Sequence, residues 1–323
     1  MCQNHTKNLS RDLKLKIICS TVVRAAKQGD IHGGLYVIDI DSGEVIHHAP
    51  YERDFVNDNE RGGERGLRGI CVLPDRILVA DSAGFTELDK NTYKIKRSHS
   101  NRDYFKSIHE ICFNDGFLWV TSTAHDAVAK LDLDFNVIDF WQLEGEDLEH
   151  SKRLTGKQSI SAEEKTEDDK YHINSLFVNN NKVLVSGLST PLYEIDTMKE
   201  ACKIPTLKAH GYSVHSFIHN FYKYDDLTIA NLTSFQAIGI SKNNSDFNIY
   251  QIPKTKNVTY HVDSIASSDW NRGLARKDNL LLIGSSPARI VIYDLETNKF
   301  IKQIQLEKDI RHAIHGLEIL DEV

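Results

Sequence analysis

The chain has 323 residues, of which 40% are hydrophobic, and its 39 basic and 46 acidic side chains give a formal net charge of −7. The basic residues are scattered, which argues against a nucleic-acid surface, because such a surface depends on clustered Lys and Arg. With no long apolar run to span or bind a membrane, no leader-like start and five cysteines without a CxxC pair, we expect a reduced, cytoplasmic protein.

Residues 14–49 open the chain with three predicted strands, Leu15–Val23, Gly34–Asp39 and Glu44–His48. Six short stretches that resemble one another follow, each beginning with a polar residue that leads into an apolar run. They start at Arg68, His109, Asn174, His219, Arg272 and His315. In the first five, a second hydrophobic run starts eight residues after the polar one, and most copies have an Asp turn further on. A period of roughly 40–50 residues with four short strands per unit predicts a β-propeller.

The second repeat shows the four expected strands most clearly. We predict them over His109–Phe113, Phe117–Ser122, Ala127–Asp132 and Val137–Leu143. A polar insertion at 144–171 follows, and we expect its segment 151–170 to be either a lid or a mobile solvated loop. Tyr51–Leu67 and Lys254–Asn271 are shorter excursions of the same kind.

The last repeat supplies only one strand, His315–Leu320. Combined with the three strands of 14–49, it completes a sixth blade, and this closure removes exposed sheet edges. The prediction is therefore an all-β, six-bladed propeller that forms one domain over residues 1–323, with the two ends of the chain sharing a blade.

The polar residue that begins each repeat is expected at the rim of the central channel, because the first strand of a blade lies nearest the axis. His109, His219 and His315 fall on alternate blades, about 120 degrees apart. Neutral imidazoles that converge in this way suit a divalent metal such as Zn, Fe or Mn. The metal would polarise a carbonyl or activate a bound water.

The other three positions are Arg68, Asn174 and Arg272. Two guanidinium groups in one funnel favour an anion, which they would hold bidentately. The predicted ligand is thus an anionic small molecule or an anionic sugar. Propeller channels are also commonly polar and filled with water, so the ring need do no chemistry, and the arginines have acidic candidates for simple ion pairs, Glu110 among them.

Several nearby residues are further candidates. His125 and Asp126, in the loop after the second strand of the second repeat, are the first choices for general acid or base. His172 precedes Asn174 by two residues and could replace it in the pocket. His215 competes with His219 for the axial position of the fourth repeat.

Some of these stretches also resemble a known group of sequences. Ile108–Ile111, Leu118–Val120, Tyr171–Leu176, His215–Ser216 and Asn271–Ala275 resemble a family of bacterial propeller proteins of unknown function. The resemblance implies a propeller and the placement of these residues, and it favours His215 where the repeat spacing favours His219. The architecture is more distantly similar to gluconolactonase and strictosidine-synthase-like propellers, whose metal ligands are carboxylates and Asn rather than His and Arg.

The first functional hypothesis is a metal-dependent enzyme that carries out hydrolysis, elimination or isomerisation of the anionic ligand. The alternatives are a non-catalytic module that binds an anionic ligand or a peptide, and a scaffold whose loops recruit another protein. Nucleic acid and membrane are not expected as partners.

Overall fold

The computed structural model describes residues 15–52, 66–144, 150–155, 170–179, 182–188, 190–202, 206–209, 212–215, 217–243, 245–259 and 268–320. These residues form strands and two short 3-10 turns, η1 (Thr123–His125) and η2 (Thr233–Phe235). No helix within these ranges is long and apolar enough to cross a membrane.

Six antiparallel sheets make up the fold, and we call them blades 1 to 6. Blade 1 contains β4 (Ile70–Val72), β5 (Arg76–Ala80), β6 (Gly84–Asp89) and β7 (Ile95–Ser100). Blade 2 contains β8 (Ile111–Asn114), β9 (Phe117–Ser122), β10 (Ala127–Leu131), β11 (Val137–Glu144) and β12 (His150–Thr155). Blade 3 contains β13 (Ser175–Asn179), β14 (Lys182–Gly187), β15 (Thr190–Glu194) and β16 (Lys199–Cys202).

Blades 4 to 6 complete the ring. Blade 4 contains β19 (Ile218–Lys223), β20 (Leu227–Leu232), β21 (Ala237–Lys242) and β22 (Asn248–Gln251). Blade 5 contains β23 (Asn271–Lys277), β24 (Leu280–Ser285), β25 (Arg289–Asp294) and β26 (Lys299–Gln305). Blade 6 has the order β27 (His312–Leu320), β1 (Lys16–Val23), β2 (Gly33–Asp39) and β3 (Val45–Tyr51).

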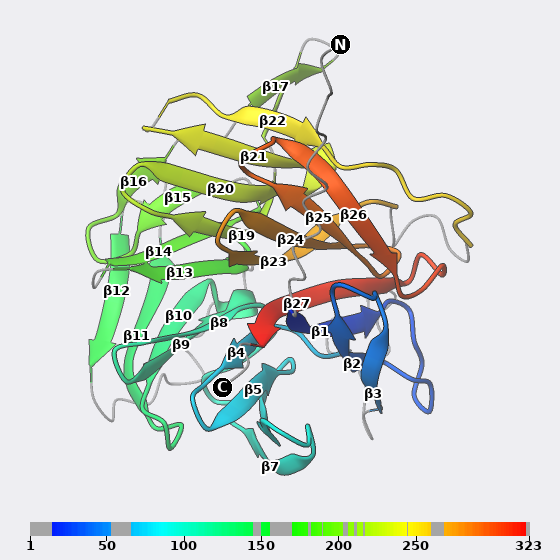
Figure 1. The fold of residues 1–323 in the computed structure, drawn as a ribbon. Coiled ribbons are helices and arrows are strands. Elements are labelled where there is room, and N and C mark those ends of the chain that lie inside the picture. The colour runs from blue at the N-terminus through cyan, green and yellow to red at the C-terminus, as the bar shows by residue number, and fades with distance from the viewer. Residues whose placement is uncertain are drawn as a thin grey trace, which may run out of the picture.

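The first strands of the blades contact one another in a closed circle, β4 to β8, β13, β19, β23, β27 and back to β4. Figure 1 shows these strands toward the middle of the molecule, with β3, β7, β12 and β16 at its periphery. This is a six-bladed β-propeller, as the sequence predicts. The pairing of Lys16 with Leu320 joins the two ends of the chain in one sheet and confirms that they share a blade.

The repeated aspartates hold the turns between the third and fourth strands. The carboxylates of Asp39, Asp89, Asp132 and Asp294 each accept a backbone N–H from the residues that follow. Such Asx turns hold the chain in a tight reversal through hydrogen bonds within the turn itself. This local role explains why aspartate recurs at this position.

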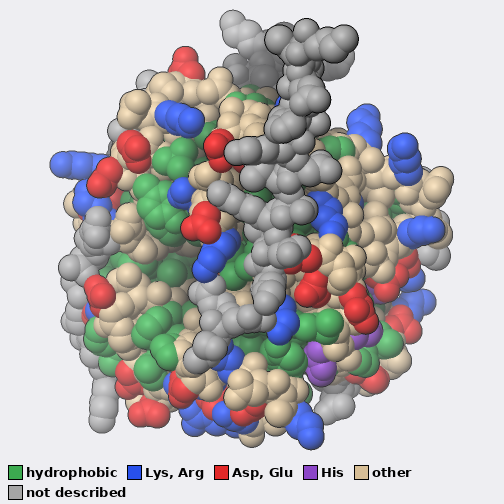
Figure 2. Space-filling view, in the orientation of Figure 1, with side chains coloured by type: hydrophobic (Ala, Val, Ile, Leu, Met, Phe, Trp, Pro, Cys, Tyr) green, Lys and Arg blue, Asp and Glu red, His purple; other side chains and the backbone are tan. Residues whose placement is uncertain are grey.

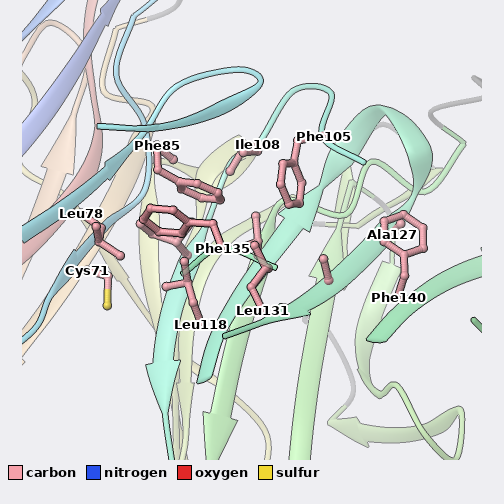
Figure 3. Packing of buried hydrophobic residues seen from close by; sticks show 14 of the residues in the cluster. Cys71, Leu78, Phe85, Phe105, Ile108, Leu118, Ala127, Leu131, Phe135 and Phe140 are labelled. Carbon is pink, nitrogen blue, oxygen red and sulfur yellow. The ribbon is translucent and has the colours of Figure 1, made fainter. Parts of the chain in front are cut away.

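Apolar side chains fill the space between neighbouring blades. Between blades 1 and 2, Phe85 lies 5.5 Å from Phe105 and 5.3 Å from Phe135, measured between ring centroids (Figure 3). Comparable buried clusters join the other blades. The core is therefore distributed around the ring, which holds the inner strands at fixed positions about the axis.

Three features differ from the prediction. His109 and Glu110 precede β8, because their N–H groups are taken by the Thr121 hydroxyl instead of a regular strand ladder. Within the insertion, β12 pairs with β11 as a fifth strand, so residues 150–155 are neither lid nor loop. A two-stranded hairpin also lies between blades 3 and 4 along the chain, formed by β17 (Thr206–Ala209) and β18 (Tyr212–His215). Segments 53–65 and 260–267 of the shorter excursions, and 156–169 of the insertion, lie outside the described residues.

Candidate functional site

The residues predicted for the channel rim come together at the axis. Arg68, His109, Asn174, His219 and His315 are each at most 7% exposed, and Arg272 is half-buried. On the face shown in Figure 2, basic and acidic side chains are interspersed. Arg68 and Arg272 thus gather inside the molecule with the other ring residues, and we call this group the cationic chamber.

A buried threonine holds the ring of His109. The His109 Nδ1 atom lies 2.9 Å from Thr123 Oγ1 and 2.8 Å from the carbonyl oxygen of Ser107. Thr123 donates its single hydrogen to the carbonyl of Ile173, at 2.7 Å, so it can only accept from the imidazole. Nδ1 therefore carries the hydrogen, and Nε2 bears the lone pair in the neutral ring.

Blade 4 repeats this device. His219 Nδ1 lies 2.9 Å from Thr233 Oγ1, and Thr233 donates to the carbonyl of Asn271 at 2.8 Å. Both threonines are buried at the start of a 3-10 turn and follow their histidine by 14 residues. Both threonines could have been identified from this equal spacing in the sequence, but the sequence prediction did not include them.

Two more imidazoles complete the cluster. The ring of His109 lies 4.9 Å from that of His315 and 5.1 Å from that of His172, measured between centroids. His172 adopts a left-handed backbone with φ of 51°. Its chain neighbours are fixed by Asp126, whose carboxylate accepts the N–H groups of Tyr171 at 3.0 Å and Ile173 at 3.4 Å.

The arginines crowd the same space. Arg68 donates from Nη1 to the carbonyl of Ile108 at 3.2 Å. The same nitrogen lies 3.1 Å from His109 Nδ1, a contact between two donors rather than a hydrogen bond, because Nδ1 carries a hydrogen. Arg24, from the loop after β1, joins the chamber with its guanidinium 5.0 Å from the centre of the Trp270 ring. Burial lowers the pKa of Arg24 to about 10.

Burial and like charges together act on the titrating groups. Burial, followed by Arg24 and Arg68, holds the pKa of Arg272 well below 12.5. Burial lowers the pKa of His219 and His315 well below 6.5, and in both Arg272 is the largest contribution after burial. These two imidazoles are therefore neutral at neutral pH, while the guanidinium groups repel one another in a medium that screens charge poorly.

Several of the buried polar atoms that have no hydrogen-bond partner within the described part of the chain belong to the ring residues. They include Asn174 Nδ2, His219 Nε2, Arg272 Nε and His315 Nδ1. Two of these, Asn174 Nδ2 and Arg272 Nε, are donors, and each such atom left without a partner costs roughly 1–3 kcal/mol. These two donors are therefore available to an acceptor group of a ligand.

The remaining predicted residues have other surroundings. His125 lies in η1, and its Nδ1 is 3.0 Å from the hydroxyl of Ser122 in the same blade. The Asp126 carboxylate accepts hydrogen bonds from the backbone that leads into blade 3. His219, not His215, occupies the axial place in blade 4: His215 belongs to β18 of the separate hairpin, and its side chain lies outside the described residues. Their predicted catalytic and binding roles stay predictions.

The predicted metal site also stays a prediction. Over the described ranges, no group of three or more His, Cys, Asp or Glu side chains is arranged to hold a metal ion. The two clamped histidines nevertheless present Nε2 as a free lone pair, which is the form that binds metals.

No protein-family model matches this chain, and no curated protein matches it. Among solved structures, it is similar to a chain of the nidogen/laminin complex, with a TM-score of 0.54 and 7% identity over 95% of this chain and 98% of that one. Catalytically inactive virginiamycin B lyase from Staphylococcus aureus with quinupristin gives a TM-score of 0.43 and 11% identity, over 78% and 73% of the two chains. The computationally designed protein Ika8 gives 0.41 and 11%, over 93% and 95%. At such identities the likeness concerns the fold alone.

Proposed function

We propose that the protein binds a small anionic molecule, carrying carboxylate or phosphate groups, in the cationic chamber. The observation that carries this proposal is the gathering of Arg24, Arg68 and Arg272 around neutral imidazoles. Each charged group that shifts the pKa of Arg272 is another arginine. An anion would relieve this repulsion and satisfy the buried donors on Arg272 and Asn174.

The test is thermal unfolding and calorimetric titration with citrate and with inorganic phosphate, each compared with sodium chloride at equal ionic strength. We expect at least one of the two anions to raise the Tm saturably, and Arg272→Gln to remove the effect. Arg276→Gln is the matched control, because Arg276 lies further along the same strand and donates to the carbonyl of Asp278. Stabilisation no larger than that of chloride, or an unchanged response of Arg272→Gln, would refute the proposal.

Catalysis assisted by a metal is the second candidate function. It is favoured by the threonine clamps, which leave Nε2 of His109 and His219 as lone pairs near His315. These three residues would hold a divalent ion such as Zn, Fe or Mn, which would supply a Lewis acid for hydrolysis, elimination or isomerisation of the bound anion.

Elemental analysis of untagged protein tests this candidate. We expect about one equivalent of metal in the wild type if the three residues bind it, and its loss in His109→Ala. Substoichiometric metal that His109→Ala does not change would leave anion binding without catalysis as the function.

A further inference from the structure

A second, chemically different compartment lies along the same axis. It is a cavity of ≈ 220 Å³, lined by residues of the inner strands that follow the ring residues within a few positions along the chain. The polar residues in its lining are Glu110, Glu318, Asn220, Tyr222, Cys71 and Cys112, and the rest of the wall is apolar. We call it the acidic cavity.

A hydrogen bond between two residues of the lining crosses the axis. Asn220 of blade 4 donates from Nδ2 to the carboxylate of Glu110 in blade 2, although these blades are not neighbours. The amide is fixed in this orientation because Asn220 Oδ1 accepts the N–H of Gly273 at 2.7 Å. Glu110 thus belongs to the acidic cavity and is held away from the arginines.

Glu318 brings a second carboxyl group from β27. Its side chain is half-buried, and among the described residues the N–H of Ile319 donates the hydrogen bond that acts on its pKa. Burial raises the pKa of Glu318 to about 8 and that of Glu110 well above 4.5, where Glu318 adds to the effect of burial. Two half-buried carboxyl groups that share one cavity resist ionising together, and a counter-charge between them would favour their ionised forms.

We propose that the acidic cavity binds a small organic cation, a primary ammonium group attached to a short apolar chain. The ammonium donates hydrogen bonds to Glu110 and Glu318, and the chain packs against apolar walls that include Leu176 and Phe221. A hard metal ion suits the cavity less well, because it requires six or more oxygen ligands and would meet apolar side chains. The proposal uses none of the arginines or histidines, so it is independent of the function proposed above.

The probe is n-butylammonium, with n-butanol as a neutral molecule of similar shape. At pH 7 we expect butylammonium, and not butanol, to raise the Tm saturably. Glu318 is mostly protonated at this pH, so cation binding will expel its proton. Titration calorimetry in two buffers of different ionisation enthalpy should show release approaching one proton per cation bound.

Glu318→Gln and Glu110→Gln should each weaken butylammonium binding at least tenfold. Glu200→Gln makes the same chemical change on the exposed side of β16 and should leave binding unchanged. Equal effects of butanol and butylammonium, or wild-type binding by both cavity variants, would overturn the proposal. Should the variants fail to fold, the wild type still decides: no stabilisation by the cation beyond that of sodium chloride, or no proton release, overturns it.

Discussion

Glutamine at position 318 should change how the stability of the protein depends on pH. The pKa of Glu318 is raised from 4.5 to about 8 in the folded protein. Its contribution to stability is therefore fully present below pH 4.5, declines as the unfolded chain ionises, and is lost above about pH 8. Each pKa unit corresponds to about 1.4 kcal/mol, so the decline amounts to roughly 4–5 kcal/mol.

Glutamine has nearly the same shape and does not titrate. The difference in the free energy of unfolding between Glu318→Gln and the wild type should therefore grow in favour of the variant by about 4 kcal/mol between pH 5 and pH 9. Urea denaturation at intervals of pH measures this difference directly. Glu200→Gln, at an exposed position, should give a flat difference. A flat or opposite trend for Glu318→Gln would show that the carboxyl group is not neutral in the folded state.

Two further predictions concern buried polar groups. Asp126→Ala should lower the free energy of unfolding by about 2–4 kcal/mol, since two backbone N–H groups at the start of blade 3 lose their acceptor. Urea denaturation measures this loss. Asp126→Asn keeps one side-chain oxygen and should therefore lose less stability. Arg289→Met should cost about 3–5 kcal/mol, because Asp269, 2.9 Å away and 4% exposed, would keep a buried charge without its counterion. The double variant with Asp269→Asn should recover part of this loss in the same assay, and a double variant no more stable than Arg289→Met would contradict the explanation.

The ring at the axis could be predicted from the sequence because it depends on periodicity alone. One polar residue starts each repeat, and the propeller turns equal positions along the chain into equal positions around the axis. His109, His219 and His315 were found in this way. The same rule favours His219 over His215 for the axial place in blade 4, and His219 lies in β19, the first strand of that blade.

The contacts that support the ring could not be predicted from the same rule. Thr123 and Thr233 recur at an equal distance from their histidines, but their hydrogen-bond partners are backbone carbonyls of the next blade, which carry no sequence signal. Likewise, β12 has the polar sequence of a loop, because an edge strand with one neighbour needs little apolar surface. The hairpin of β17 and β18 has no counterpart in the other repeats, so periodicity gives no information about it.

The separation of the two compartments follows from the residue after each ring position. In blades 1, 5 and 6 this residue is glycine. A side chain at two of these positions would collide with the backbone: a Cβ on Gly69 would lie 2.8 Å from the backbone nitrogen of Ile111, and one on Gly316 would lie 2.3 Å from the carbonyl oxygen of Arg68. The inner strands therefore approach closely at this level. In the space that remains, Glu110 and Asn220 bridge the axis. Glu110 is held by Asn220 and not by an arginine, so the guanidinium groups and the carboxyl groups of one channel do not neutralise each other. The cationic chamber therefore favours an anion, and the acidic cavity favours a cation that would ionise its carboxyl groups.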